Sequence, residues 1–112
     1  MSKARTERIA AAALLFAALG DETRLALLQR LSHGGPASIS TLAESFDVTR
    51  QAGTKHLNVL SEAGVVAGNR EGREHVWAIN PRTLADAGRY LEIIASGWDD
   101  ALARLKAHVE RR

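Results

Sequence analysis

The stretch TRQAGTKHLNVLSEAG, Thr49 to Gly64, decides how the rest of the chain is interpreted. At about 100° per residue, a helix here separates small and apolar residues from hydrogen-bonding residues. Thr49 can cap the first turn with its hydroxyl, and Gly64 can adopt the left-handed conformation that closes the last turn. We therefore predict a delimited helix with one packed face. The packed face comprises Ala52, Gly53, His56, Leu57, Val59, Leu60 and Ala63.

The opposite face of this predicted helix carries side chains that suit a DNA groove. Arginine pairs with guanine edges, glutamine and asparagine pair with adenine edges, and threonine and lysine contact phosphates or bases. An ordinary solvated helix face is the alternative. The candidate DNA-contacting residues are Thr49, Arg50, Gln51, Thr54, Lys55 and Asn58.

A short helix is predicted immediately before Thr49. Ser40 or Thr41 starts it, and Glu44 stands at capping-box spacing from Thr41. Only Asp47 and Val48 then separate the two helices, which is the short connection of a helix-turn-helix motif over residues 40–63. A glycine within the packed face of the second helix, Gly53, lets the helices cross closely. The buried face of the first helix comprises Ile39, Leu42, Ala43 and Phe46.

Two further helices are expected before this motif. The run Ile9 to Leu19 is apolar all round, so it must be covered on more than one side, and another subunit is the second cover we expect. Basic residues before this run make a secretion signal the rival interpretation, which Glu7 argues against. Asp21 caps the next helix. Arg24 near its start is either a structural ion-pair partner or a phosphate contact, and we favour the structural interpretation. The core face of that helix comprises Leu25, Leu28 and Leu31.

A β-hairpin is predicted after the helix-turn-helix motif, over residues 65–79. Val65 to Arg70 and Arg73 to Ile79 form its strands across a Glu71-Gly72 turn. Arg70 and Arg73 flank the tip, where they either contact the DNA backbone or a second groove, or are ordinary solvated charges. Trp77 and Ile79 share one strand face and are expected to anchor the hairpin to the core.

A long helix is predicted over residues 81–109, with Asn80-Pro81 as its cap and first turn. Its apolar residues recur at heptad spacing, which indicates a helix-pairing seam. Gly88 and the Ser96-Gly97 pair leave open whether the helix is continuous. We expect a dimer surface shared with the first helix. Its candidate residues are Ile9, Leu15, Phe16, Leu84, Leu91, Ile94, Trp98, Leu102 and Leu105.

Composition restricts the function classes. A chain of 112 residues is one domain in size, and its formal charge of +2 means that attraction to DNA must come from local clusters of Lys and Arg. The chain has no cysteine, which excludes disulfides and thiolate metal sites and fits a reducing compartment. No stretch reaches transmembrane length. No phosphate loop, nucleophile elbow or paired acid and base is present, so we expect no enzyme, catalytic residue or cofactor.

The predicted order of elements resembles the ArsR-type (SmtB/ArsR) winged-helix transcriptional repressors. The residues that carry the resemblance are ALGDETRLALLQRL (Ala18 to Leu31), VTRQAGTKHLNVLSEAGVV (Val48 to Val66) and GREHVWAINP (Gly72 to Pro81). The second segment is similar to the family's S-x-H-L-x-x-L-x-x-A-G-L-V block. The resemblance implies a mainly α fold with a β-hairpin wing, forming one winged helix-turn-helix domain over residues 1–112.

The same resemblance implies a cytoplasmic homodimer that binds double-stranded DNA at a pseudo-palindromic operator and leaves it when an effector binds. The family's metal sensors use cysteine pairs or His, Asp and Glu sets on the terminal helix. This chain lacks cysteine, and Asp99, Asp100, His108 and Glu110 lack the family's spacing, so we expect no metal site. A winged-helix module that binds a protein partner is the alternative function. Such a module would prefer apolar or acidic anchors on the exposed helix face.

Overall fold

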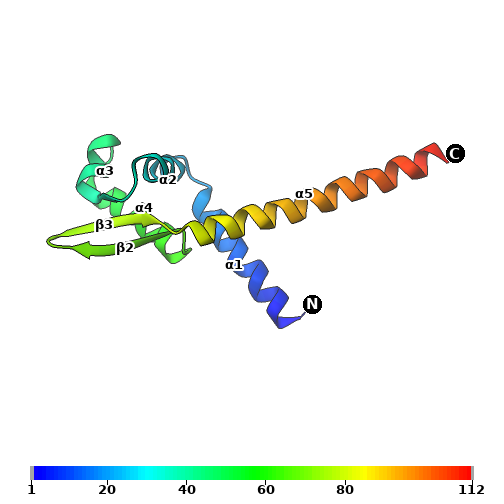
Figure 1. Ribbon diagram of the computed structural model, residues 1–112, viewed down its shortest axis with the longest axis horizontal. Coiled ribbons are helices and arrows are strands. Elements are labelled where there is room, and N and C mark those ends of the chain that lie inside the picture. Colours follow the sequence, from blue (N-terminus) through cyan, green and yellow to red (C-terminus); the bar gives the residue numbers. More distant parts are fainter. Residues whose placement is uncertain (1, 112) are drawn as a thin grey trace.

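The computed structural model describes residues 2–111, which form six helical and strand elements around a core and two long helices that extend from it (Figure 1). The elements are α1 (Lys3–Leu19), α2 (Glu22–Gly34), β1 (Ala37–Ser38), α3 (Ile39–Ser45), α4 (Arg50–Glu62), β2 (Val66–Glu71), β3 (Glu74–Ile79) and α5 (Pro81–Glu110). Helices α2, α3 and α4 gather with the sheet, whereas most of α5 projects away as a single rod. None of the described helices is long and apolar enough to cross a membrane.

The hairpin belongs to a three-stranded antiparallel sheet in the order β1-β3-β2. Glu71 pairs with Glu74, so the turn is Gly72-Arg73 and not the predicted Glu71-Gly72. This register places Gly72 at the first turn position. Its φ of 64° suits that position, and a glycine adopts it without strain. Strand β1 was not predicted, because two residues show no periodicity. It is defined only by its pairing with β3, in which Ala37 lies opposite Trp77.

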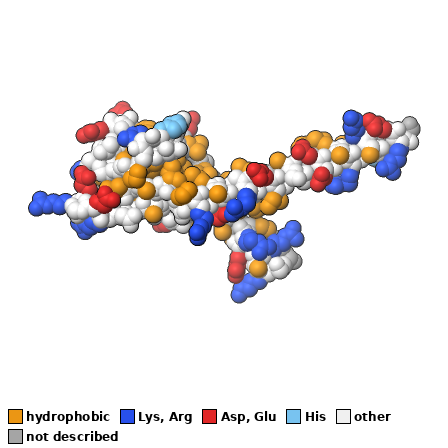
Figure 2. Space-filling view, viewed as in Figure 1, with side chains coloured by type: hydrophobic (Ala, Val, Ile, Leu, Met, Phe, Trp, Pro, Cys, Tyr) orange, Lys and Arg blue, Asp and Glu red, His pale blue; other side chains and the backbone are white. Residues whose placement is uncertain are grey.

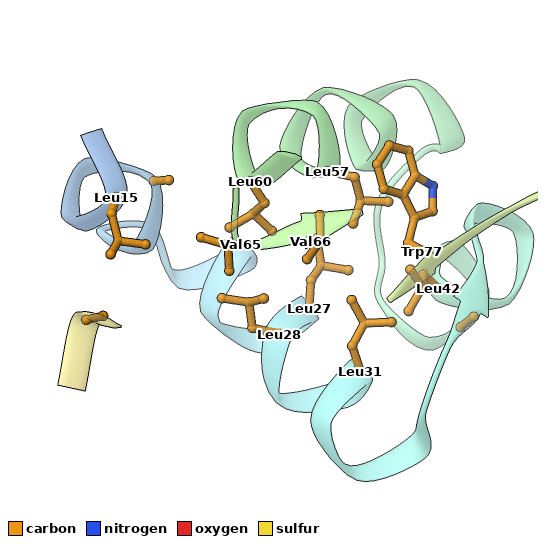
Figure 3. Close-up of a cluster of buried hydrophobic side chains, with 13 residues drawn as sticks. Leu15, Leu27, Leu28, Leu31, Leu42, Leu57, Leu60, Val65, Val66 and Trp77 are labelled. Atoms are coloured by element: carbon orange, nitrogen blue, oxygen red, sulfur yellow. The ribbon is translucent and has the colours of Figure 1, made fainter. Parts of the chain in front are cut away.

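The core lies between α2, α3, α4 and the sheet, and the C-terminal half of α1 contributes Leu15 and Ala18 to it (Figure 3). Its largest fully buried side chains are Leu27, Leu42, Leu57, Leu60 and Val65. Trp77 on β3 is also buried against this cluster, and Ile79 packs beside it. The prediction that these two residues anchor the wing is therefore confirmed.

Two residues predicted to face the core are exposed instead. Leu25 is 52% exposed, and Leu27 takes its place in the core beside Leu28 and Leu31. Leu25 lies about 200° around the helix from Leu27, so both cannot point into the same core. Val59 is 39% exposed, because it lies at the margin of the face that Leu57 and Leu60 bury.

The helix caps explain where the two helices of the helix-turn-helix motif begin. The hydroxyl of Thr49 accepts a hydrogen bond from Ala52 N at 3.0 Å, as predicted, and Gly64 has φ of 77° after the end of α4. The cap of α3 is Ser38, not Ser40 or Thr41. Its hydroxyl accepts from Thr41 N at 3.2 Å, because its extended backbone at the end of β1 leaves the hydroxyl beside the first turn.

Gly53 brings α3 and α4 close together, as predicted. A Cβ at this position would lie 2.8 Å from the terminal methyl carbon of Ile39 on α3, closer than normal packing allows. Glycine therefore costs some helix stability at this position but permits the close crossing. A larger residue here would require the end of the Ile39 side chain to shift.

Helix α1 extends further than its sequence pattern predicted, whereas α5 has the predicted extent to within one residue. Helix α1 begins at Lys3 rather than Ile9, because the hydroxyl of Ser2 accepts a hydrogen bond from Arg5 N at 3.1 Å and caps it. Helix α5 runs without a break through Ser96 and Gly97 to Glu110. The question of its continuity is thereby answered for the described residues.

Candidate DNA-binding surface

Helix α4 presents the predicted polar face to solvent. Arg50, Gln51, Lys55 and Asn58 are exposed, and Thr54 is half-buried. The opposite face of the helix is held in the core by Leu57 and Leu60. The polar side chains therefore project from a helix that the core fixes from behind, which is the arrangement in which a helix can enter a DNA groove.

Three of the candidate residues at the start of α4 also bond within the chain. The Thr49 hydroxyl caps the helix, and the Thr54 hydroxyl donates to the carbonyl of Arg50 at 2.8 Å. The Arg50 guanidinium donates a hydrogen bond to the hydroxyl of Ser40 on α3. Arg50 is thus held at the junction of the two helices, whereas Gln51 and Lys55 extend from the exposed face. The sequence pattern could not show which of these side chains bond within the chain and which extend into solvent.

The wing carries the second group of candidate residues. Arg70 on β2 and Arg73 in the turn are both exposed. Lys and Arg side chains extend from the end of the molecule where the β2-β3 turn lies (Figure 2). A solvated position therefore leaves both guanidinium groups available to phosphates.

A hollow of about 410 Å³ joins the two groups of basic residues. It lies between the start of α3, the start of α4 and the wing, and Arg50, Arg73 and His75 contribute to its lining. Helix and wing cations therefore border one concave surface. His75 was not among the predicted site residues. The sequence feature that could have indicated His75 is its position two residues before Trp77 on the same strand. In the structure, the His75 ring stacks on the Trp77 ring with centroids 4.5 Å apart.

A polar cluster lies behind α4, on the side that faces α1 and α2. Arg24 contacts His56 and the C-terminal carbonyls of α1, and the carboxylate of Asp21 lies 3.8 Å from His56 Nδ1. The hydrogen bond from Arg24 N, together with the positive charge of Arg24, holds the pKa of Asp21 below its ordinary value. Both Arg24 and His56 therefore make contacts within the chain. This agrees with the structural interpretation of Arg24 and with the prediction that His56 lies on the packed face of α4.

The candidate dimer residues fall into two groups. Leu91 and Trp98 are 53% and 64% exposed, and Ile94, Leu102, Leu105 and Ile9 are exposed with them. The structure corrects the assignment of Leu15, which is only 7% exposed because it packs in the core of its own chain. The remaining two, Phe16 and Leu84, are half-buried against that core. Ile93, exposed and not predicted, extends the apolar surface of α5.

The helix-turn-helix motif followed by the hairpin wing defines a winged helix-turn-helix protein. Residues 19–69 match a family model described as a helix-turn-helix domain. Transcriptional repressor SdpR from Bacillus subtilis is 31% identical over 87 residues, which cover 77% of this chain and 96% of the relative. An ArsR-like transcriptional regulator from Rhodococcus sp. RHA1 superposes with a TM-score of 0.81 at 40% identity. That match covers 89% of this chain and 93% of the relative.

A homodimeric winged helix-turn-helix DNA-binding domain from Mycobacterium bovis, Mb0332, shares the fold. Its TM-score is 0.68 at 21% identity, over 89% of each chain. The similarities to SdpR and to the Rhodococcus regulator establish the family. The chain belongs to the ArsR-type family of winged helix-turn-helix transcriptional regulators. It is a DNA-binding regulator, and the prediction that it is not an enzyme is confirmed by this kinship.

Proposed function

We propose that the protein represses transcription in the cytoplasm by binding a pseudo-palindromic operator as a homodimer. Residues 1–112 act as a single winged helix-turn-helix domain in this proposal. The observation that carries it is the exposed face of α4, where Gln51, Lys55 and Asn58 project opposite the buried Leu57 and Leu60. A rigid helix with hydrogen-bonding groups on its free face suits base recognition. The same face offers few apolar anchors for a protein partner.

We assign different tasks to the helix and to the wing. Gln51 and Asn58 have donor and acceptor groups that pair with adenine edges, and Arg50 can pair with guanine. Arg70 and Arg73 lie on the wing and are assigned to phosphates. The hollow that Arg50 and Arg73 border supports a DNA backbone that passes between the start of α4 and the wing.

Substitutions in the two groups should have different effects. Gln51→Ala should relax the base preference at one operator position and cost roughly 1 to 3 kcal/mol there, because a pair of base-edge hydrogen bonds is lost. Arg50→Ala should act similarly. Arg73→Ala should weaken binding to all sequences alike. Titration of each variant against the operator and a panel of single-base changes measures the difference.

Lys106→Ala serves as the control for these titrations, because it removes an exposed positive charge from the far part of α5. It should leave both affinity and base preference unchanged. If the changes in α4 and in the wing lowered affinity for every sequence to the same degree, α4 would not read bases directly.

We infer the homodimer from the apolar residues that α1 and α5 leave exposed. Beyond Tyr90, α5 displays Leu91, Ile94, Trp98 and Leu102 along its length without cover from its own chain. Exposed apolar surface on this scale marks an interaction site in a protein that dissolves in water. The homodimeric state of the M. bovis relative supports a second copy of this chain as the cover.

A small-molecule effector is also part of the proposal, and the absence of cysteine directs it away from thiolate-bound metals. A hollow of about 320 Å³ between α1 and α5 is lined largely by apolar side chains, among them Ala12, Ala87 and Tyr90. Ala63, at the C-terminal end of α4, borders it, so a ligand here would touch the end of the recognition helix. Compounds that release the bound operator should lose this effect in an Ala12→Phe variant. Unchanged release would exclude the hollow.

A further inference from the structure

Arg24 on α2 completes the C-terminal end of α1. The last turn of α1 contains no basic residue. The Arg24 Nε–H donates to the carbonyl of Ala18 at 2.6 Å, and Nη2 donates to the carbonyl of Ala17 at 3.3 Å. Carbonyls at the end of a helix lack partners within the helix and carry partial negative charge. The guanidinium from the next helix therefore gives the Ala18 carbonyl a donor and places positive charge at the helix end. It is a second donor to the Ala17 carbonyl, which also accepts from Gly20 N at 3.2 Å.

The same guanidinium reaches the recognition helix. Arg24 Nη1 lies 3.3 Å from His56 Nδ1 on α4. Because a guanidinium donates hydrogen bonds and cannot accept them, Nδ1 must be the acceptor, and the imidazole is neutral with its proton on Nε2. Asp21 Oδ2 is 3.8 Å from the same nitrogen, where two acceptors form no hydrogen bond. This carboxylate instead accepts from Arg24 N at 3.0 Å.

His56 occupies the part of α4 from which the reading residues project. It follows Lys55 directly and lies within one turn of Asn58, on the opposite side of the helix. A bond at His56 therefore restricts rotation of α4 about its own axis at the level of these side chains. Hydrogen bonds to base edges require placement to within about 0.5 Å. A small rotation of α4 would misplace them while leaving the phosphate contacts of the wing in reach.

We propose that Arg24 and His56 are positioning residues for operator recognition, with Arg24 as a bridge between the C-terminus of α1 and α4. The inference rests on the proposed reading of DNA by α4. It assigns a second task to α1, which also carries part of the proposed dimer surface. Through this bridge, the dimer surface on α1 is linked to the orientation of α4. The link consists of the Arg24 side chain and the His56 tautomer that accepts its hydrogen bond.

The tautomer provides a test that does not depend on DNA. In the full-length protein labelled with ¹⁵N-histidine and held at pH 8, the two ring nitrogens of His56 have distinct chemical shifts. Loss of one set of signals in His56→Asn assigns them. We expect Nδ1 to be unprotonated and Nε2 to carry the proton, and Arg24→Lys to move the Nδ1 signal. A proton on Nδ1, or an Nδ1 signal indifferent to Arg24→Lys, would overturn the proposal.

A matched pair of substitutions at His56 tests the consequence for DNA. Asparagine keeps a hydrogen-bond acceptor near the position of Nδ1, whereas leucine has a similar size and no acceptor. His56→Leu should lower operator affinity roughly tenfold, the loss expected for one hydrogen bond to a charged group, and should leave nonspecific DNA binding unchanged. His56→Asn should restore most of the operator affinity. Equal losses in the two variants, or none in His56→Leu, would contradict a positioning role.

If His56→Leu does not fold, Arg24→Lys tests the positioning role instead. Lysine keeps the positive charge, but one ammonium group cannot span both α1 carbonyls and His56. Operator affinity should fall roughly tenfold, with Arg104→Lys on the exposed part of α5 as the unaffected control. Full affinity in Arg24→Lys would refute the bridge. If the unmodified protein showed no operator preference, the proposed reading function would fail, and the tautomer measurement would still decide the inference.

Discussion

Leu91→Asp combined with Trp98→Asp should reduce operator affinity to the level of nonspecific DNA and leave a folded monomer. Both side chains are mostly exposed in the single chain, so the new carboxylates remain in water when the protein is monomeric. In the proposed dimer they would lie in the α5 interface. An unpaired buried charge is costly enough to separate the subunits.

The loss should be large because one recognition helix contacts few base pairs. Two-fold dimers place two such helices about 34 Å apart, one turn of DNA. Specific binding is typically about a thousandfold or more tighter than nonspecific binding. Sedimentation together with an operator titration measures both consequences. Arg104→Asp, a carboxylate on another face of α5, serves as the control that should remain dimeric. A double variant that still sediments as a dimer with full affinity would move the dimer contact to α1.

Operator binding should weaken about a thousandfold between 50 and 200 mM salt. The exposed cations Arg50, Lys55, Arg70 and Arg73 are assigned to the DNA surface, and a dimer with on the order of six phosphate contacts releases a matching number of counterions. Affinity measured at several salt concentrations gives the slope. Arg73→Ala should reduce that slope by about one for each subunit. A response that is flat with salt would remove the phosphate assignment.

Features that depend on neighbouring residues were predictable from the sequence. The Thr49 cap and the Gly64 terminus of α4 both follow from chemistry within one helical turn, and both are observed. The role of Gly53 was predictable for a related reason. A glycine in the packed face of a helix implies close contact, although only the structure identifies Ile39 as the side chain it admits.

Features that depend on distant residues were not predictable. Strand β1 is set by its pairing with Trp77 and Val76, about forty residues along the chain. The choice between Leu25 and Leu27 depends on which side of α2 the remaining elements cover. Leu15 was assigned to a dimer surface because an apolar run alone does not show which of its residues its own chain buries.

In the candidate site too, features that depend on neighbouring residues were predictable, and features that depend on distant residues were not. Exposure of Gln51, Lys55 and Asn58 followed from helical periodicity. The bond from Arg50 to Ser40 and the bridge from Arg24 to His56 join separate helices, and no local pattern contains them. Periodicity can therefore identify which face of a helix is free, whereas the contacts that orient this face require the fold.

Selection of binding sites from random double-stranded DNA tests the central claim most directly. A homodimer that reads bases through α4 should enrich two inverted half-sites whose centres lie about one DNA turn apart. The same selection with Gln51→Ala should keep the spacing and lose preference at one symmetry-related position in each half-site. Recovery of unrelated sequences, or of a single half-site without its inverted partner, would contradict base recognition by a two-fold pair of α4 helices.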